Sequence, residues 1–119
     1  MPTASGHTRV IAASKVKGTS IYGTDGHKIG SVEDVFLDKM SNNILFAALG
    51  LGGFLGIGEK FHPVPWSVLD YDEAKGGYVI PYSKDELKNA PAFELSELKR
   101  NDAAIRDQAF TYYKVDKLQ

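Results

Sequence analysis

The residues best suited to chemistry are few and are spread along the chain. The three histidines, His7, His27 and His62, fall in the N-terminal segment, in a predicted turn and in a predicted strand before a proline. No two of them have the i, i+4 spacing that presents paired imidazoles to a metal. Asp34 and Asp38 are four residues apart on a predicted strand, about 13 Å, which is too far for a paired acid and base. We therefore expect no catalytic, metal or cofactor site.

A glycine-rich segment, residues 50–58, has the composition of a phosphate-binding loop but not its context. A nucleotide loop leads into a helix, or ends in Lys-Ser or Lys-Thr, and this segment is followed by a charged pair and a proline-containing strand. One interpretation is that the glycines turn the backbone while Phe54, Leu55 and Ile57 enter the core. The other is that some of these three side chains stay exposed as a contact patch.

Composition narrows the class of protein. The 119 residues, 43% of them hydrophobic, suit one compact domain. A net charge of −1 provides no positive field for phosphates, so we do not expect a nucleic-acid partner. The absence of cysteine excludes disulfides and thiolate chemistry and leads us to expect a cytoplasmic protein. Residues 40–58 carry no charge, but their glycines favour a strand and a loop over an integral membrane helix.

The middle of the chain has the pattern of a small all-β domain. Turn residues recur about every 8 to 12 positions, which predicts short strands in a barrel or sandwich. A β-bulge near residues 33–34 would return Val32 and Val35 to the same face. Ser83 and Glu86 match a capping box, which predicts a short helix ending near Asn89. The predicted strands cover residues 20–22, 28–38, 44–51, 60–65, 68–72 and 78–82.

The third predicted strand, residues 44–51, is apolar on both faces, so both faces need to be covered. One face would fill a barrel interior. The other would be covered by the tail, by a partner or by a second subunit. A tail helix is expected over residues 101–113, in which Ile105, Ala109 and Tyr112 form one apolar stripe. We expect this tail to dock on its own barrel or on a second subunit.

A series of motifs then resembles a known family. Val16 to Tyr22, Gly26 to Asp38 with its Ile-Gly-x-Val-x-Asp-Val core, Ala47 to Lys60 and Val64-Pro-Trp66 together resemble the PRC-barrel domain. The end of the chain is similar to stand-alone bacterial members. The resemblance implies a small, highly twisted antiparallel β-barrel that contacts other proteins and has no catalytic residues. The expected organisation is an N-terminal arm (residues 1–15), a barrel domain (16–90) and a C-terminal helical tail (91–119).

Two functions from different classes follow. The first is a non-enzymatic protein–protein interaction module that forms a homodimer and binds a protein partner through Phe54, Leu55, Ile57, Ile105 and Tyr112. The alternative is a small-ligand sensor or enzyme with a pocket at the barrel mouth near His62 and Trp66, lined also by Glu59 and Asp70. An exposed apolar patch without converging polar groups favours the interaction module. A deep polar pocket favours the small-ligand sensor or enzyme.

Overall fold

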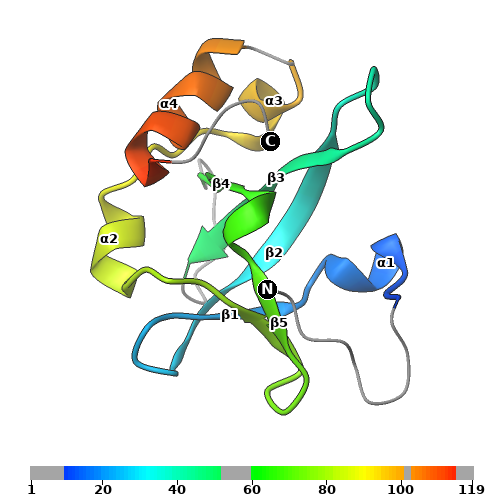
Figure 1. Cartoon of the computed structure of the whole chain (residues 1–119). Helices are drawn as coiled ribbons and strands as arrows, with labels where there is room; N and C mark the ends of the chain where they lie inside the picture. Colours follow the sequence, from blue (N-terminus) through cyan, green and yellow to red (C-terminus); the bar gives the residue numbers. More distant parts are fainter. Residues whose placement is uncertain (1–9, 52–59, 101–102, 115–119) are drawn as a thin grey trace.

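The computed structural model describes residues 10–51, 60–100 and 103–114, which form a bent β-sheet with helices packed against it (Figure 1). The strands fall close to their predicted positions, and β3 matches its predicted limits. In chain order the elements are α1 (Ala13–Val16), β1 (Ser20–Tyr22), β2 (Lys28–Leu37), β3 (Ile44–Leu51), β4 (His62–Pro65), the 3-10 turn η1 (Trp66–Val68), β5 (Asp70–Asp72), β6 (Gly77–Val79), α2 (Lys84–Lys88), α3 (Leu95–Leu98) and α4 (Ala103–Tyr113).

The sheet is mixed, which corrects the expectation of an antiparallel barrel. Its strand order is β4-β3-β2-β1-β6-β5, and β1 pairs with β6 in parallel while the other pairs are antiparallel. In the described ranges the outer strands β4 and β5 do not pair with each other, so hydrogen bonds do not close the sheet. The two prolines of β4 agree with this edge position, because proline donates no ladder hydrogen bond.

The long β2–β3 hairpin forms the centre of the sheet. Its register shifts between Val32 and Asp34, which confirms the predicted bulge. Next to this bulge the two backbones approach closely. A Cβ added to Gly30 would lie only 2.0 Å from the carbonyl oxygen of Gly50, so only glycine fits there. Beyond the bulge, the hairpin extends past both neighbouring strands, since β1 pairs with β2 only up to Ser31 and β4 pairs with β3 only from Phe46 onward.

Two hydrophobic clusters lie on opposite faces of β3. Ala47 and Leu49 point into the barrel cluster, which also contains Ile21, Val64 and Leu87. The other face of β3 packs against the end of the chain in a second cluster, called here the tail cluster, made of Phe46, Ala48, Phe61, Leu98, Ile105, Ala109 and Phe110. The prediction that both faces of this strand are covered is confirmed, and the cover on the second face is the chain's own tail.

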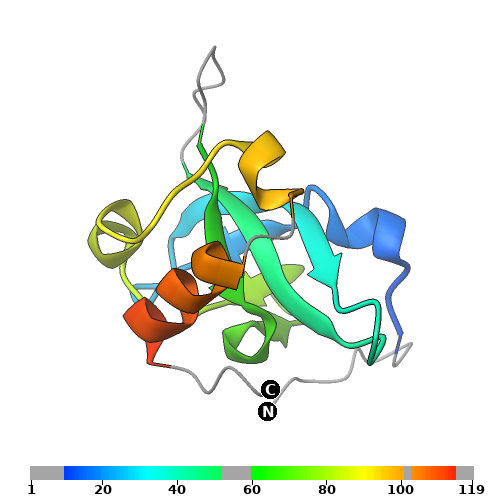
Figure 2. The ribbon, with the colours of Figure 1, turned by 90° about the horizontal axis from the view of Figure 1, so that it is seen from above.

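Hydrogen bonds also attach the tail to the barrel. The backbones of Phe61 and Phe93 exchange two hydrogen bonds of 2.8 and 2.9 Å just before β4. At the far end of α4, the Tyr112 hydroxyl donates to the Glu86 carbonyl oxygen at 2.7 Å. Helices α2 and α4 consequently lie together on the side of the molecule away from α1 (Figure 2). The predicted capping box begins α2, since Ser83 and Glu86 exchange side-chain to backbone bonds.

Candidate interaction surface

The residues predicted to make an interaction surface do not form one patch in the described structure. Phe54, Leu55 and Ile57 lie outside the described residues. Ile105 is 6% exposed and packs into the tail cluster, so it is mainly a core residue of this chain. Tyr112, near the other end of α4, is 38% exposed, and its hydroxyl donates a hydrogen bond to the Glu86 carbonyl oxygen of α2.

The described residues of the alternative pocket come from three successive elements, β4, η1 and β5. His62 is 7% exposed on β4, where burial lowers the pKa of its imidazole and the carbonyls of Pro91 and Ala90 partly oppose that effect. Trp66 is half-buried, and its ring makes a T-shaped contact with that of Tyr78 in the barrel cluster, with ring centroids 5.5 Å apart. Asp70 begins β5, which follows β4 and η1 in the chain, and it is half-buried. Glu59 lies outside the described residues.

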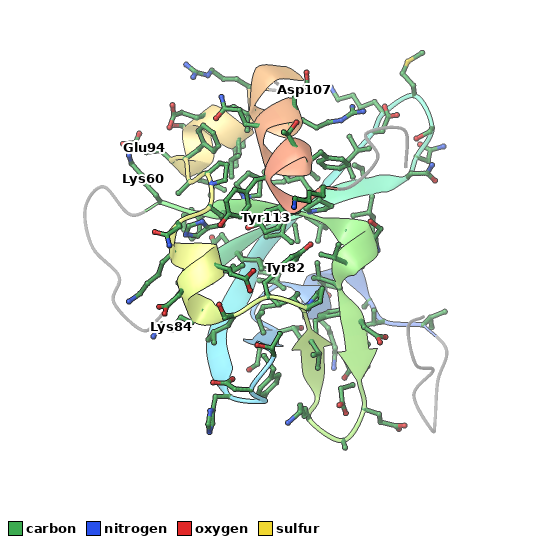
Figure 3. The ribbon with its side chains drawn as sticks, turned by 60° about the vertical axis from the view of Figure 1, so that its left-hand side comes forward. Lys60, Tyr82, Lys84, Glu94, Asp107 and Tyr113 are labelled. Atoms are coloured by element: carbon green, nitrogen blue, oxygen red, sulfur yellow. The ribbon has the colours of Figure 1, made fainter. Side chains whose placement is uncertain are left out.

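Three buried polar atoms in the described ranges belong to three different elements, β4, β5 and α4. The imidazole Nδ1 of His62, a carboxylate oxygen of Asp70 and the hydroxyl of Tyr113 are buried without a hydrogen-bond partner there. Tyr113 ends α4, and its ring packs against that of Tyr82 with ring centroids 4.8 Å apart and the planes tilted by 53° (Figure 3). Burial raises the pKa of the Tyr113 hydroxyl. Across these ranges, no three His, Asp or Glu side chains lie close enough together to hold a metal ion.

A surface groove, called here the hairpin groove, lies between the tip of the β2–β3 hairpin and the tail. Its volume is about 550 Å³, within the range of small-ligand and peptide sites. Phe36 and Phe46, stacked with ring centroids 4.8 Å apart, contribute an aromatic surface to it. The full lining is Phe36, Leu37, Asp38, Lys39, Met40, Leu45, Phe46, Leu98, Lys99, Ile105 and Arg106.

Two large apolar side chains on the hairpin side of this groove face solvent. Leu37, the last residue of β2, is 56% exposed, and Met40, inside the turn that connects β2 to β3, is 92% exposed. The turn itself is well ordered by Asp38, whose carboxylate accepts hydrogen bonds from the Met40 amide at 3.0 Å and the Ser41 hydroxyl at 3.0 Å. These exposed side chains therefore stand on a hydrogen-bonded turn at the end of a protruding hairpin.

The groove lining is positively charged, although the chain as a whole is not. It contains Lys39, Lys99 and Arg106 against the single acid Asp38. Hydrogen bonds from Met40 and Ser41 lower the pKa of the Asp38 carboxyl, and the positive charge of Arg106 acts in the same direction. Asp38 and Arg106 thus largely offset each other, and the ammonium groups of Lys39 and Lys99 carry the remaining positive charge.

Sequence reasoning missed this surface because its parts are far apart in the chain. The sequence predicts only a turn over residues 40–43, and it predicts that the tail docks without indicating which residues Lys99 and Arg106 lie near. One available signal is Met40, an apolar residue within a polar turn, three residues after Leu37 at the end of a predicted strand. Such an arrangement leaves at least one apolar side chain in solvent at a hairpin tip.

Comparison with known proteins agrees with the architecture. An uncharacterized protein of Deinococcus radiodurans is 24% identical over 91 residues, which cover 76% of this chain and 32% of that protein. The chain thus spans about a third of the length of the curated relative it matches. In the described ranges, no helix is long and apolar enough to cross a bilayer. The family model described as "PRC-barrel domain" matches residues 9–87, about two thirds of the chain, and the chain therefore belongs to the PRC-barrel domain family.

Proposed function

We propose that this protein is a non-enzymatic interaction module that binds other proteins through the hairpin groove and that also self-associates. The observation that carries the proposal is the exposure of Leu37 and Met40 beside a groove that is lined in part by aromatic and aliphatic side chains. Exposed apolar groups next to a concave surface are typical of protein contact sites. PRC-barrel domains are associated with protein interactions and are typically non-enzymatic, which supports the same reading.

Self-association is the second part of the proposal. The apolar segment that contains Phe54, Leu55 and Ile57 follows β3 directly and could supply a two-fold interface. A specific dimer of this kind should bury at least about 1,000 Å² in total. Sedimentation over a range of concentrations tests it: a dimer that weakens in Leu55→Asp supports the proposal, and a monomer at high micromolar concentration contradicts it. The cytoplasmic location stays a prediction, which fractionation of host cells tests.

The contact site itself can be tested by placing a photo-crosslinking phenylalanine analogue at Met40 in the native host. The matched control carries the analogue at Lys75, which is also exposed and lies at the turn of the β5–β6 hairpin. We expect discrete protein adducts from Met40 above the control. Equal yields from the two positions would contradict the hairpin groove as a contact site.

A further inference from the structure

The hairpin groove combines features that define the chemistry of an occupant, and this inference rests on the function proposed above. Its surface contains the stacked pair Phe36 and Phe46, with the exposed side chains of Leu37 and Met40 at its hairpin side. A methionine in solvent is flexible and polarizable, so it can adapt to apolar side chains of different shapes. The occupant should therefore insert at least one large apolar side chain.

The charge of the groove lining sets a second requirement for the occupant. Residues 21–81 hold four Lys against eight acidic residues, yet the fold places Lys39 of this acidic region in the lining of the same groove as Lys99 and Arg106 of the tail. Lys39 and Lys99 are exposed, and neither forms an ion pair within the described part of the chain. A positive rim on a protein of net charge −1 favours carboxylates on the occupant.

We propose that the hairpin groove binds an acidic peptide segment of a partner protein, with a large apolar side chain in the groove and carboxylates beside Lys39 and Lys99. The size of the groove suits a few residues of a peptide rather than a single ion. The exposed apolar side chains of Leu37 and Met40 distinguish it from a phosphate-binding surface, which would use polar donors around the same lysines.

The test uses the full chain and fluorescein-labelled synthetic peptides in anisotropy titrations. One peptide has Leu and Phe separated by Glu, and two matched peptides have Gln or Lys in place of Glu. Each contact between a Glu carboxylate of the peptide and Lys39 or Lys99 should have the ordinary strength of a surface ion pair. With two such contacts, the Glu peptide should bind about tenfold more tightly than the Gln peptide at low salt. The preference should shrink as NaCl rises from about 50 to 300 mM.

Variants separate the two requirements. Lys39→Glu with Lys99→Glu should reverse the preference toward the Lys peptide, whereas the matched pair Lys84→Glu with Lys88→Glu on α2 should leave it unchanged (Figure 3). Leu37→Ser with Met40→Ser should weaken the Glu and Gln peptides alike. Because all six of these side chains are exposed, the variants should keep the wild-type circular dichroism spectrum.

Three results would overturn the inference. The first is no binding of the Glu peptide to the wild-type chain, and the second is an unchanged peptide preference in the Lys39 and Lys99 variant. The third is displacement of the Glu peptide by a short RNA that carries the same number of negative charges. If one of these results is found but Met40 still forms protein crosslinks, the proposed interaction function is retained and only the acidic partner is rejected. Loss of the crosslinks as well would reject both.

Discussion

Replacing Phe110 with alanine should test whether the tail is part of the cooperative fold. Phe110 is 1% exposed and lies in the tail cluster with residues of β3, α3 and α4, and the Arg106 guanidinium lies 5.8 Å from the centre of its ring. Deleting a buried phenylalanine ring costs about 3 to 5 kcal/mol. Because the helix can move toward the space left behind, we expect the lower half of that range. A typical domain is stable by only about 5 to 15 kcal/mol, so the loss is a large fraction of the total.

Urea unfolding followed by tryptophan fluorescence measures this effect on the barrel rather than on the tail. Trp66, the only tryptophan, contacts Tyr78 in the barrel cluster, on the other face of β3 from Phe110. With a urea dependence of about 1.5 kcal/mol per molar, a loss of about 3 kcal/mol lowers the midpoint by about 2 M. Circular dichroism at helical wavelengths should show the same midpoint, because the tail and barrel are expected to unfold together.

The control is Thr111→Ala, at the neighbouring exposed position of α4, which should change the free energy of unfolding by less than about 0.5 kcal/mol. A Phe110→Ala variant whose Trp66 midpoint matches the wild type would refute the reasoning. An early loss of helical signal in that variant would further indicate that the tail folds separately from the barrel.

Three further substitutions test other parts of the fold. Trp66→Ala should cost about 2 to 3 kcal/mol, because the half-buried ring loses its contact with Tyr78, and thermal unfolding measures this loss. Burial lowers the pKa of His62 in the folded chain, so its contribution to stability is complete above the unfolded pKa of about 6.5 and is lost as the pH falls through the lower folded value. His62→Gln should flatten this pH dependence in urea titrations, and an unchanged dependence would contradict the assignment. Gly30→Ala should destabilise by about 3 kcal/mol or more, because its Cβ meets the Gly50 carbonyl, and a melting temperature equal to that of Ser31→Ala would contradict this.

Much of the fold could be predicted because its signals are local. The bulge near Asp34 appears as a break in alternation, and the start of α2 appears as the Ser83 and Glu86 pair. The parallel pairing of β1 with β6 could not be predicted, because alternation assigns faces to a strand without naming its neighbours. The four-residue helices α1 and α3 were also missed, since one turn is too short to show a helical period.

The candidate site was harder to predict than the strands. Ile105 was chosen from a helical stripe, but a stripe indicates burial without indicating what it packs against, and the structure places this residue in the chain's own core. The hairpin groove exists only because the tail folds back over β3, which brings Lys99 beside Lys39. Contacts between residues so far apart in sequence leave no trace in periodicity or turn signals.

The covering of β3 by the end of the chain has a consequence for biosynthesis. The residues that shield Phe46 and Ala48 include Leu98 and Phe110, so they are translated about fifty to sixty residues later. At a translation rate of roughly 5 to 20 residues per second, the apolar face of β3 stays exposed for several seconds before the tail residues that cover it are made. Ribosome-bound chains stalled before α3 should therefore bind hydrophobic-surface chaperones, and chains released at full length should not.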